Sequence, residues 1–153
     1  PDILTTAKGL GGGMPIGALL AREEAANGFV PGSHGSTFGA NPVSCRAALA
    51  VLDALDDGVL DNVVQAGKRL GERLCELAGK HAMVKQARGR GLMCGIEIDR
   101  PARPLVERAL AYGLILNATA GTVIRIIPPL VITPAEIDEG CDVIDRLLAE
   151  AAA

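Results

Sequence analysis

Apolar and polar residues follow two different periods along the chain, and these periods predict its helices and strands. Residues 59–81 place apolar side chains at helical spacing, with charged side chains between them, which predicts a long amphipathic helix. Residues 105–112 repeat this helical pattern more briefly, and Gly113 ends it. Continuous apolar runs predict strands at residues 3–7, 15–21, 92–98, 114–116 and 123–127. The strand at residues 15–21 is expected to be buried.

Two local signals predict where further helices begin. Asn41 followed by Pro42 is typical of an N-cap before a first helical position, and the helix it predicts runs to about Leu55 before Gly58 stops it. Residues 133–136 (TPAE) form a capping box with proline at the first helical position. They predict a final helix that runs to about Glu150.

These elements group into two units joined by the long helix. Residues 1–58 hold only two short strands and a helix, too few to cover both faces of a sheet. We therefore expect them to be the incomplete end of a larger α/β domain. Residues 59–81 are the connecting helix, and residues 82–153 are expected to form a small α+β domain of strand, helix, two strands and helix.

Composition excludes several classes of protein. The 153 residues suit one domain or two small pieces of a larger one, and a hydrophobic fraction of 49% excludes disorder. A net charge of −3 and only three aromatic residues disfavour a nucleic-acid surface. No apolar run approaches the roughly 20 residues that a membrane span requires.

The four cysteines stand far apart in the sequence, without a C-x-x-C pair or a nearby histidine. A zinc site needs ligands paired at short spacing, so no metal site is expected. Scattered, reduced and mostly buried thiols are typical of a cytoplasmic protein.

Lys8 is the first candidate for chemistry, because it directly follows an apolar strand and precedes the glycine string 9–13. Strand ends of α/β sheets are where ligands bind, and a lysine there can attack a carbonyl to form a Schiff base. The alternative is an ordinary surface lysine beside a turn. The glycines do not fit a phosphate-binding Walker loop, because Lys8 precedes them and no serine or threonine follows it directly. They do not fit a dinucleotide fingerprint either, because its third glycine position falls on Met14 and, around Gly89, on Cys94.

Two further segments carry polar groups that could bind an anion. The loop 35–39 offers the hydroxyls of Ser36 and Thr37 with several backbone N–H groups, a set that can bind a phosphate dianion, although it can also be a plain polar loop. Arg125 stands alone among apolar residues in a strand. On the buried side it would need an anion such as a carboxylate; an internal salt bridge and an outward face are the alternatives.

Four segments, taken in order, resemble the class III (ornithine-type, subgroup II) aminotransferases. Residues 2–18 (DILTTAKGLGGGMPIGA) resemble their pyridoxal-phosphate lysine segment, and residues 34–42 (HGSTFGANP) resemble their next signature loop. Residues 88–96 (RGRGLMCGI) and 123–130 (VIRIIPPL) resemble segments of their C-terminal domain. Within the family, the sequence is most similar to the acetylornithine branch.

The resemblance implies roles for individual residues. Lys8 would be the Schiff-base lysine that holds pyridoxal phosphate as an internal aldimine, and Arg125 would bind the substrate α-carboxylate. Thr37, with Ser36 beside it, would reach the cofactor phosphate of the neighbouring subunit in a homodimer. Ala40 stands where the family usually has glycine, and it would restrict the backbone if that position needs a positive φ.

The resemblance also implies a fold and an activity. The fold is the α/β fold type I of pyridoxal-phosphate-dependent transferases, here the end of the large domain and the small C-terminal domain. The activity is transfer of the terminal amino group of N-acetylornithine to 2-oxoglutarate in arginine biosynthesis. The family's phosphate loop, ring-stacking aromatic and pyridine-binding acid lie before the first residue, so we expect the chain by itself to be inactive. The alternatives are another class III activity, on ornithine or 4-aminobutyrate, or a non-catalytic interaction domain.

Overall fold

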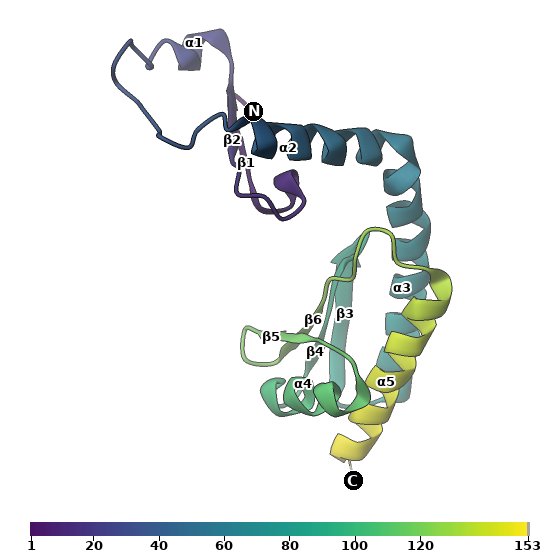
Figure 1. Cartoon of the computed structure of the whole chain (residues 1–153). Coiled ribbons are helices and arrows are strands. Elements are labelled where there is room, and N and C mark those ends of the chain that lie inside the picture. The colour runs from purple at the N-terminus through teal and green to yellow at the C-terminus, as the bar shows by residue number, and fades with distance from the viewer. Residues whose placement is uncertain (153) are drawn as a thin grey trace. The chain divides into compact units, whose positions relative to one another are not determined.

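The computed structural model describes residues 1–152, which divide into two compact units (Figure 1). The first unit comprises Pro1–Gly58, and the second begins at Val59. The boundary between the two units follows Gly58, the glycine that precedes the long amphipathic pattern of residues 59–81. No helix within residues 1–152 is long and apolar enough to cross a membrane.

The first unit is built on an antiparallel pair of strands. Strand β1 (Ile3–Thr6) pairs with β2 (Ala18–Ala21), and the 3-10 turn η1 (Lys8–Gly11) lies between them in the sequence. The expected second strand is therefore present, but it is not buried: Leu19 and Leu20 are 51% and 58% exposed. Two strands alone form a single layer, and within this unit no second layer covers them.

The helices of the first unit are α1 (Glu23–Ala26) and α2 (Pro42–Ala54). The predicted cap of α2 is confirmed, because the Asn41 side-chain oxygen accepts hydrogen bonds from the backbone N–H groups of Val43 (3.0 Å) and Ser44 (3.2 Å). The predicted stop is also confirmed. After α2 the chain passes through η2 (Leu55–Val59), where Gly58 has a φ of 86°, a conformation that glycine adopts without a steric penalty.

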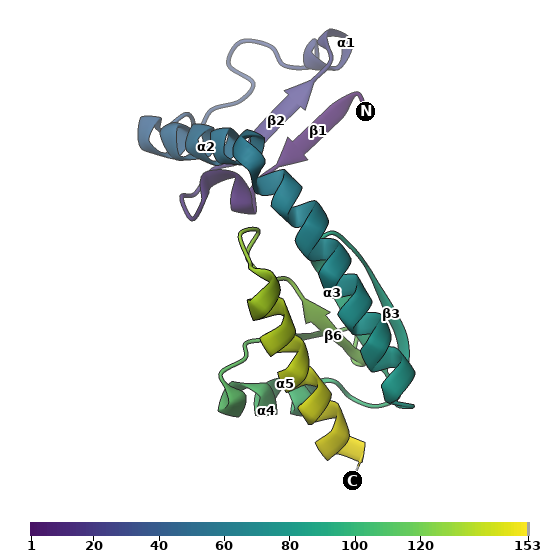
Figure 2. The same ribbon diagram turned by 90° about the vertical axis from the view of Figure 1, so that its right-hand side faces the viewer.

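The second unit is a four-stranded antiparallel sheet with two long helices against one face (Figures 1 and 2). The strands are β3 (Val84–Arg90), β4 (Met93–Ile98), β5 (Asn117–Thr119) and β6 (Val123–Ile126), in the order β3-β4-β6-β5. The helices are α3 (Leu60–Lys80) and α5 (Pro134–Ala152), with α4 (Arg103–Ala109) and η3 (Leu110–Tyr112) between β4 and β5. Leu74, Ile96, Ile124 and Leu148 are among the core side chains that sheet and helices bury together.

Two expectations for this unit were wrong. Strand β3 was not expected, because its outward positions are polar and only Val84, Ala87 and Gly89 face the helices. Residues 114–116 do not form a strand; β5 begins afterwards, at Asn117. Its position is set by the turn that joins it to β6, in which Ala120 and Gly121 take φ values of 49° and 76°. A short apolar run does not reveal such a turn.

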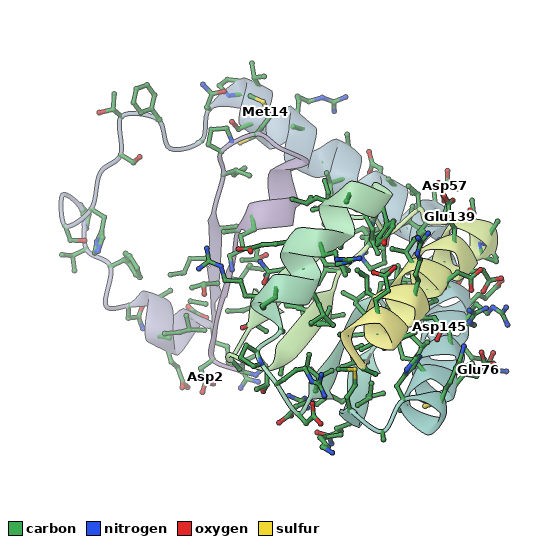
Figure 3. The ribbon with its side chains drawn as sticks, turned by 90° about the horizontal axis from the view of Figure 1, so that it is seen from below. Asp2, Met14, Asp57, Glu76, Glu139 and Asp145 are labelled. Carbon is green, nitrogen blue, oxygen red and sulfur yellow. The ribbon has the colours of Figure 1, made fainter. Side chains whose placement is uncertain are left out.

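Ion pairs link the two long helices. Arg69 donates two hydrogen bonds of 2.9 Å to the carboxylate of Asp138, which holds the pKa of Asp138 below its usual value. Asp145, seen on α5 in Figure 3, accepts hydrogen bonds from Lys80 and from the buried His81. These pairs are partly exposed, so they orient the helices more than they stabilise them. The expected capping box of α5 is confirmed, since Thr133 N–H donates to Glu136 at 2.8 Å.

Helix α3 and the β3–β4 turn approach each other closely, and this contact gives the first testable prediction. A Cβ added at Gly67 would lie 2.6 Å from Gly91 Cα. Gly67→Ala is therefore expected to lower the free energy of unfolding by about 1–3 kcal/mol through overpacking. Gly71→Ala on the same helix is the matched control, because its Cβ would meet nothing within 4 Å. It should raise the free energy of unfolding by up to about 1 kcal/mol.

Urea unfolding of both variants, followed by circular dichroism at the helical band, measures the difference. Equal stability of the two variants would contradict the close contact.

Candidate active site

Lys8 occupies an unusual backbone position at the end of β1. It is the first residue of η1, and its φ is 54°, in the left-handed region that non-glycine residues rarely adopt. An L-residue there carries a strain of about 1–2 kcal/mol. Such strain persists where the surrounding structure imposes it, and it occurs most often at functional sites.

The glycines after Lys8 pack closely against their surroundings. A Cβ on the buried Gly11 would lie 2.7 Å from Ile16 Cγ2, and one on Gly12 would lie 3.1 Å from Val51 Cγ2 of α2. The turn is closed by hydrogen bonds from Leu10 N–H to the Ala7 carbonyl (3.2 Å) and from Gly12 N–H to the Gly9 carbonyl (3.1 Å). The glycine string therefore lets the turn that begins at Lys8 pack closely.

Ser36 and Thr37 lie in the exposed loop before α2. The Ser36 hydroxyl oxygen accepts a hydrogen bond of 2.9 Å from Gly39 N–H, which closes the loop on itself. The Thr37 hydroxyl makes no hydrogen bond to any residue from 1 to 152. Thr37 therefore keeps its full capacity for a ligand, whereas part of the capacity of Ser36 is used within the loop. Their binding roles stay predictions.

Ala40 follows in the same loop with a φ of 56°. The sequence raised the question of whether this position needs a positive φ, and in the structure it does. A methyl group thus stands in a left-handed position directly before Asn41, the cap of α2. The strained backbone therefore lies where the loop meets the start of α2.

Arg125 lies on β6 in the second unit, on the face of the sheet that points away from α3 and α5. Its side chain is exposed, while its neighbours Ile124 and Ile126 are buried in the core. Of the alternatives that the sequence left open, the structure shows the outward face. Within the part of the chain that the structure describes, Arg125 has no salt bridge.

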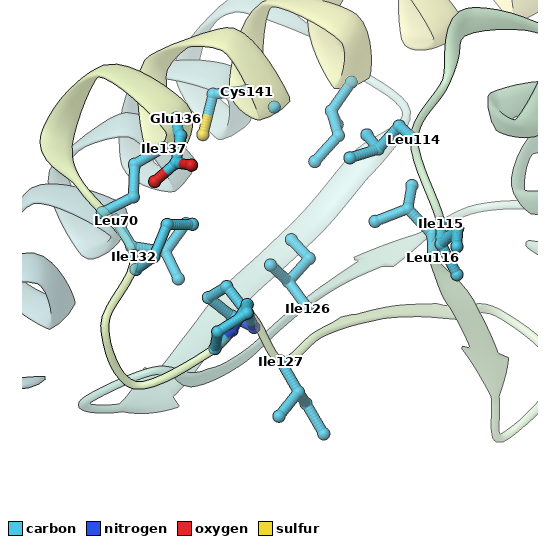
Figure 4. Close-up of a pocket in the computed structure, with 14 residues that line it drawn as sticks. Leu70, Leu114, Ile115, Leu116, Ile126, Ile127, Ile132, Glu136, Ile137 and Cys141 are labelled. Atoms are coloured by element: carbon cyan, nitrogen blue, oxygen red, sulfur yellow. The ribbon is translucent and has the colours of Figure 1, made fainter.

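A separate apolar cavity of about 360 Å³ lies in the second unit, beneath the segment 114–116 (Figure 4). Glu136 and Cys141 reach its wall from α5. Glu136 is already bound to Thr133, and burial raises the pKa of the Cys141 thiol to about 11, so it is uncharged at neutral pH. This cavity carries no reactive group, and we assign it no part in the site.

A family model described as aminotransferase class-III matches residues 1–148. The chain belongs to this family. It is 49% identical over 152 residues to the acetylornithine aminotransferase of Caldanaerobacter subterraneus subsp. tengcongensis, an alignment that covers 98% of this chain and 38% of the relative. The acetylornithine aminotransferase of Aquifex aeolicus is 49% identical over 148 residues, with 97% of this chain and 38% of the relative covered.

Solved structures of class III aminotransferases show the same fold. The acetylornithine aminotransferase of Elizabethkingia anophelis superposes with a TM-score of 0.90 at 34% identity, covering 98% of this chain and 39% of that one. The ornithine aminotransferase of Toxoplasma gondii gives a TM-score of 0.91 at 34% identity, covering 99% and 38%. The α/β fold type I of pyridoxal-phosphate-dependent enzymes, expected from the sequence, is confirmed. The chain spans about 38% of the length of the curated relatives it matches.

The donor groups of the first unit fit the cofactor that the family implies. Pyridoxal phosphate presents an aldehyde carbon and a phosphate dianion. Lys8 offers an exposed primary amine, and Thr37 offers an exposed hydroxyl; neither group is bound to another residue in the range 1–152. An amine suits the aldehyde and a hydroxyl suits the phosphate, so the residues present match the chemistry of the group.

Sequence reasoning missed two structural features near the candidate residues, one in each unit. The left-handed backbone of Lys8 has no signal in the sequence, because lysine does not favour it. The second is an ion pair between Arg88 and Glu97, which lie on the same sheet face as Arg125. It was missed because β3 was not expected, and the alternation of side chains along that strand would have revealed it.

The strain at Ala40 gives the second prediction. Ala40→Gly should stabilise the loop and the first turn of α2 by about 0.5–1 kcal/mol, because glycine adopts a positive φ without a steric penalty. Ala50→Gly, inside α2, is the matched control and should destabilise the helix by a similar amount. We expect slower amide hydrogen exchange at Val43 and Ser44 in Ala40→Gly. In Ala50→Gly we expect faster exchange along α2. Faster exchange in both would show that Ala40 is not strained.

Proposed function

We propose that this chain is the lysine-bearing part of a pyridoxal-phosphate-dependent aminotransferase that transfers the terminal amino group of N-acetylornithine to 2-oxoglutarate. The observation that carries the proposal is Lys8, held in a left-handed backbone conformation at the end of β1. Two curated relatives named acetylornithine aminotransferase, each 49% identical to this chain, support the choice of substrate.

Pyridoxal phosphate, when bound, supplies an electron sink that stabilises negative charge on the substrate carbon beside the amine. The chain's own residues would bind, orient and move protons. Lys8 Nζ would hold the cofactor covalently at its aldehyde carbon and leave when the substrate amine takes its place. The freed Nζ would then act as general base, taking the proton from the substrate carbon and returning it one position away.

Binding and orientation would come from Thr37 and Arg125. The Thr37 hydroxyl would donate a hydrogen bond to the cofactor phosphate of a neighbouring subunit, which makes a homodimer part of the proposal. The planar guanidinium of Arg125 would receive the α-carboxylate of 2-oxoglutarate through two parallel hydrogen bonds. The cytoplasmic location expected from the cysteines completes the proposal.

Ornithine is the second candidate for the amino donor. The ornithine aminotransferase of Toxoplasma gondii superposes as well as the acetylornithine enzyme of Elizabethkingia anophelis, with TM-scores of 0.91 and 0.90. Turnover of the full-length subunit with each donor, at matched concentrations and with 2-oxoglutarate as acceptor, decides between them. A preference for ornithine would replace N-acetylornithine in the proposal and leave the reaction type intact.

The role of Lys8 gives the third prediction. Borohydride reduction of the cofactor-loaded subunit, followed by peptide mapping, should place the label on Lys8, because this amine is exposed and its backbone is fixed. Lys8→Ala should lose the label and the transaminase activity. Lys68→Ala is the control and should keep both. A label on Lys68, Lys80, Lys85 or any lysine outside this chain would exclude the assignment.

The role of Arg125 gives the fourth prediction. Arg125→Lys should lower kcat/KM for 2-oxoglutarate, because the point charge of lysine does not replace the two parallel donors of arginine. The expected loss of transition-state stabilisation is about 2–5 kcal/mol. The half-reaction with N-acetylornithine should suffer less, since the α-carboxylate of that substrate lies at the end away from the reacting amine. Arg103→Lys on the exposed side of α4 is the control. Unchanged turnover of 2-oxoglutarate in Arg125→Lys would refute the role.

A further inference from the structure

The loop between α1 and α2 forms a tight turn before it reaches the hydroxyl groups of the candidate site. Ser33 N–H donates a hydrogen bond of 3.0 Å to the Val30 carbonyl, which closes a turn with Pro31 and Gly32 at its centre. Gly32 has a φ of 81°, as the third residue of a type II turn requires, and proline suits the second position. The residues of this turn thus favour the backbone that they adopt.

The turn brings two aromatic rings together. Phe29 directly precedes the turn and His34 directly follows it, and their ring centroids lie 4.5 Å apart with the ring planes tilted by 45°. Aromatic pairs at such separations attract each other beyond the apolar area that they bury. Ser33 Oγ and His34 Nδ1 are also joined by a hydrogen bond of 2.9 Å. The ring pair therefore closes residues 29–34 into one unit.

A second closed turn contains Thr37. The hydrogen bond of 2.9 Å from Gly39 N–H to Ser36 Oγ joins the two ends of residues 36–39, and Thr37 lies between them. After this turn the chain soon reaches Asn41, whose side chain caps α2. On this side, the backbone near Thr37 is anchored to a helix.

On the other side, the anchor is the ring pair. Gly35 alone separates His34 from the turn at residues 36–39. Glycine has more backbone freedom than any other residue, so Gly35 does not restrain the chain by itself. A loop that is closed before its ligand arrives loses less conformational freedom on binding, which strengthens the binding. The ring pair is thus placed to hold the chain that leads to Thr37.

We propose that His34 is a positioning residue that stacks on Phe29 and thereby holds the loop that presents Thr37 to the cofactor phosphate. This inference rests on the proposed function, in which the Thr37 hydroxyl binds that phosphate. In this role His34 acts through the loop and needs no contact with the cofactor. Its effect is therefore confined to ligands that carry a phosphate. Pyridoxal, which has the same aldehyde but a hydroxyl in place of the phosphate, gains nothing from it.

The test measures the Kd of pyridoxal phosphate and of pyridoxal for the cofactor-free full-length subunit; the ratio of the two is the phosphate preference. Phe29→Leu and His34→Leu are each expected to lower this preference roughly two- to tenfold, the fold-change that corresponds to one aromatic pair. The double variant should lower it no further than either single variant, because both remove the same contact. His34→Phe, which keeps an aromatic ring, should restore most of the preference.

Ser33→Ala is the matched control, because it removes the hydrogen bond to His34 and leaves both rings in place. Its preference should stay within about twofold of the unmodified protein, since one exposed hydrogen bond contributes little. His34→Gln keeps a hydrogen-bonding group without a ring, and it repeats the test if a leucine variant unfolds.

Three outcomes would overturn the proposal: an unchanged preference in Phe29→Leu and His34→Leu, additive losses in the double variant, or an equal loss of affinity for both ligands. The equal loss would show that the rings support the fold alone. Thr37→Val separates this inference from the proposed function. An unchanged preference in Thr37→Val refutes the role of Thr37. A lowered preference there, with none in the ring variants, refutes only the role of His34.

Discussion

The packing of α3 against the sheet is the contact on which the second unit depends. Leu70, Leu74 and Leu77 form its buried stripe, and they meet side chains of β3, β4 and β6 in one apolar core. The approach is so close at one end that Gly67 faces the backbone of Gly91. This packing decides which side of the sheet is apolar. The side chains that alternate with the core residues must then point outward, and Arg88, Glu97 and Arg125 are among them.

The first unit depends on a different constraint, the backbone of its glycine turn. Gly11 and Gly12 pack closely against Ile16 and Val51, and Lys8, at the start of the same turn, has a left-handed conformation. Around this turn, Leu4, Leu19 and Leu20 stay exposed, because two strands do not enclose a core. The unit therefore has little apolar packing of its own, although it carries the lysine on which the proposed chemistry depends.

The outward face of the sheet in the second unit carries charged side chains. On this face Glu97 is bound to Arg88, and Arg125 is the arginine without such a partner in the described residues. An exposed pair of this kind contributes little to stability.

The sequence by itself determined the local features of this protein. The caps at Asn41 and Thr133, the stop at Gly58 and the long stripe of α3 follow from a few adjacent residues, so their signals are complete in the sequence. The motif around Lys8 likewise identified the family without the structure. Tertiary structure decided the rest: strand β3, the start of β5, and the left-handed backbones of Lys8 and Ala40. Each of these depends on residues distant in sequence or on a turn geometry that opposes local preference, so no short pattern predicts them.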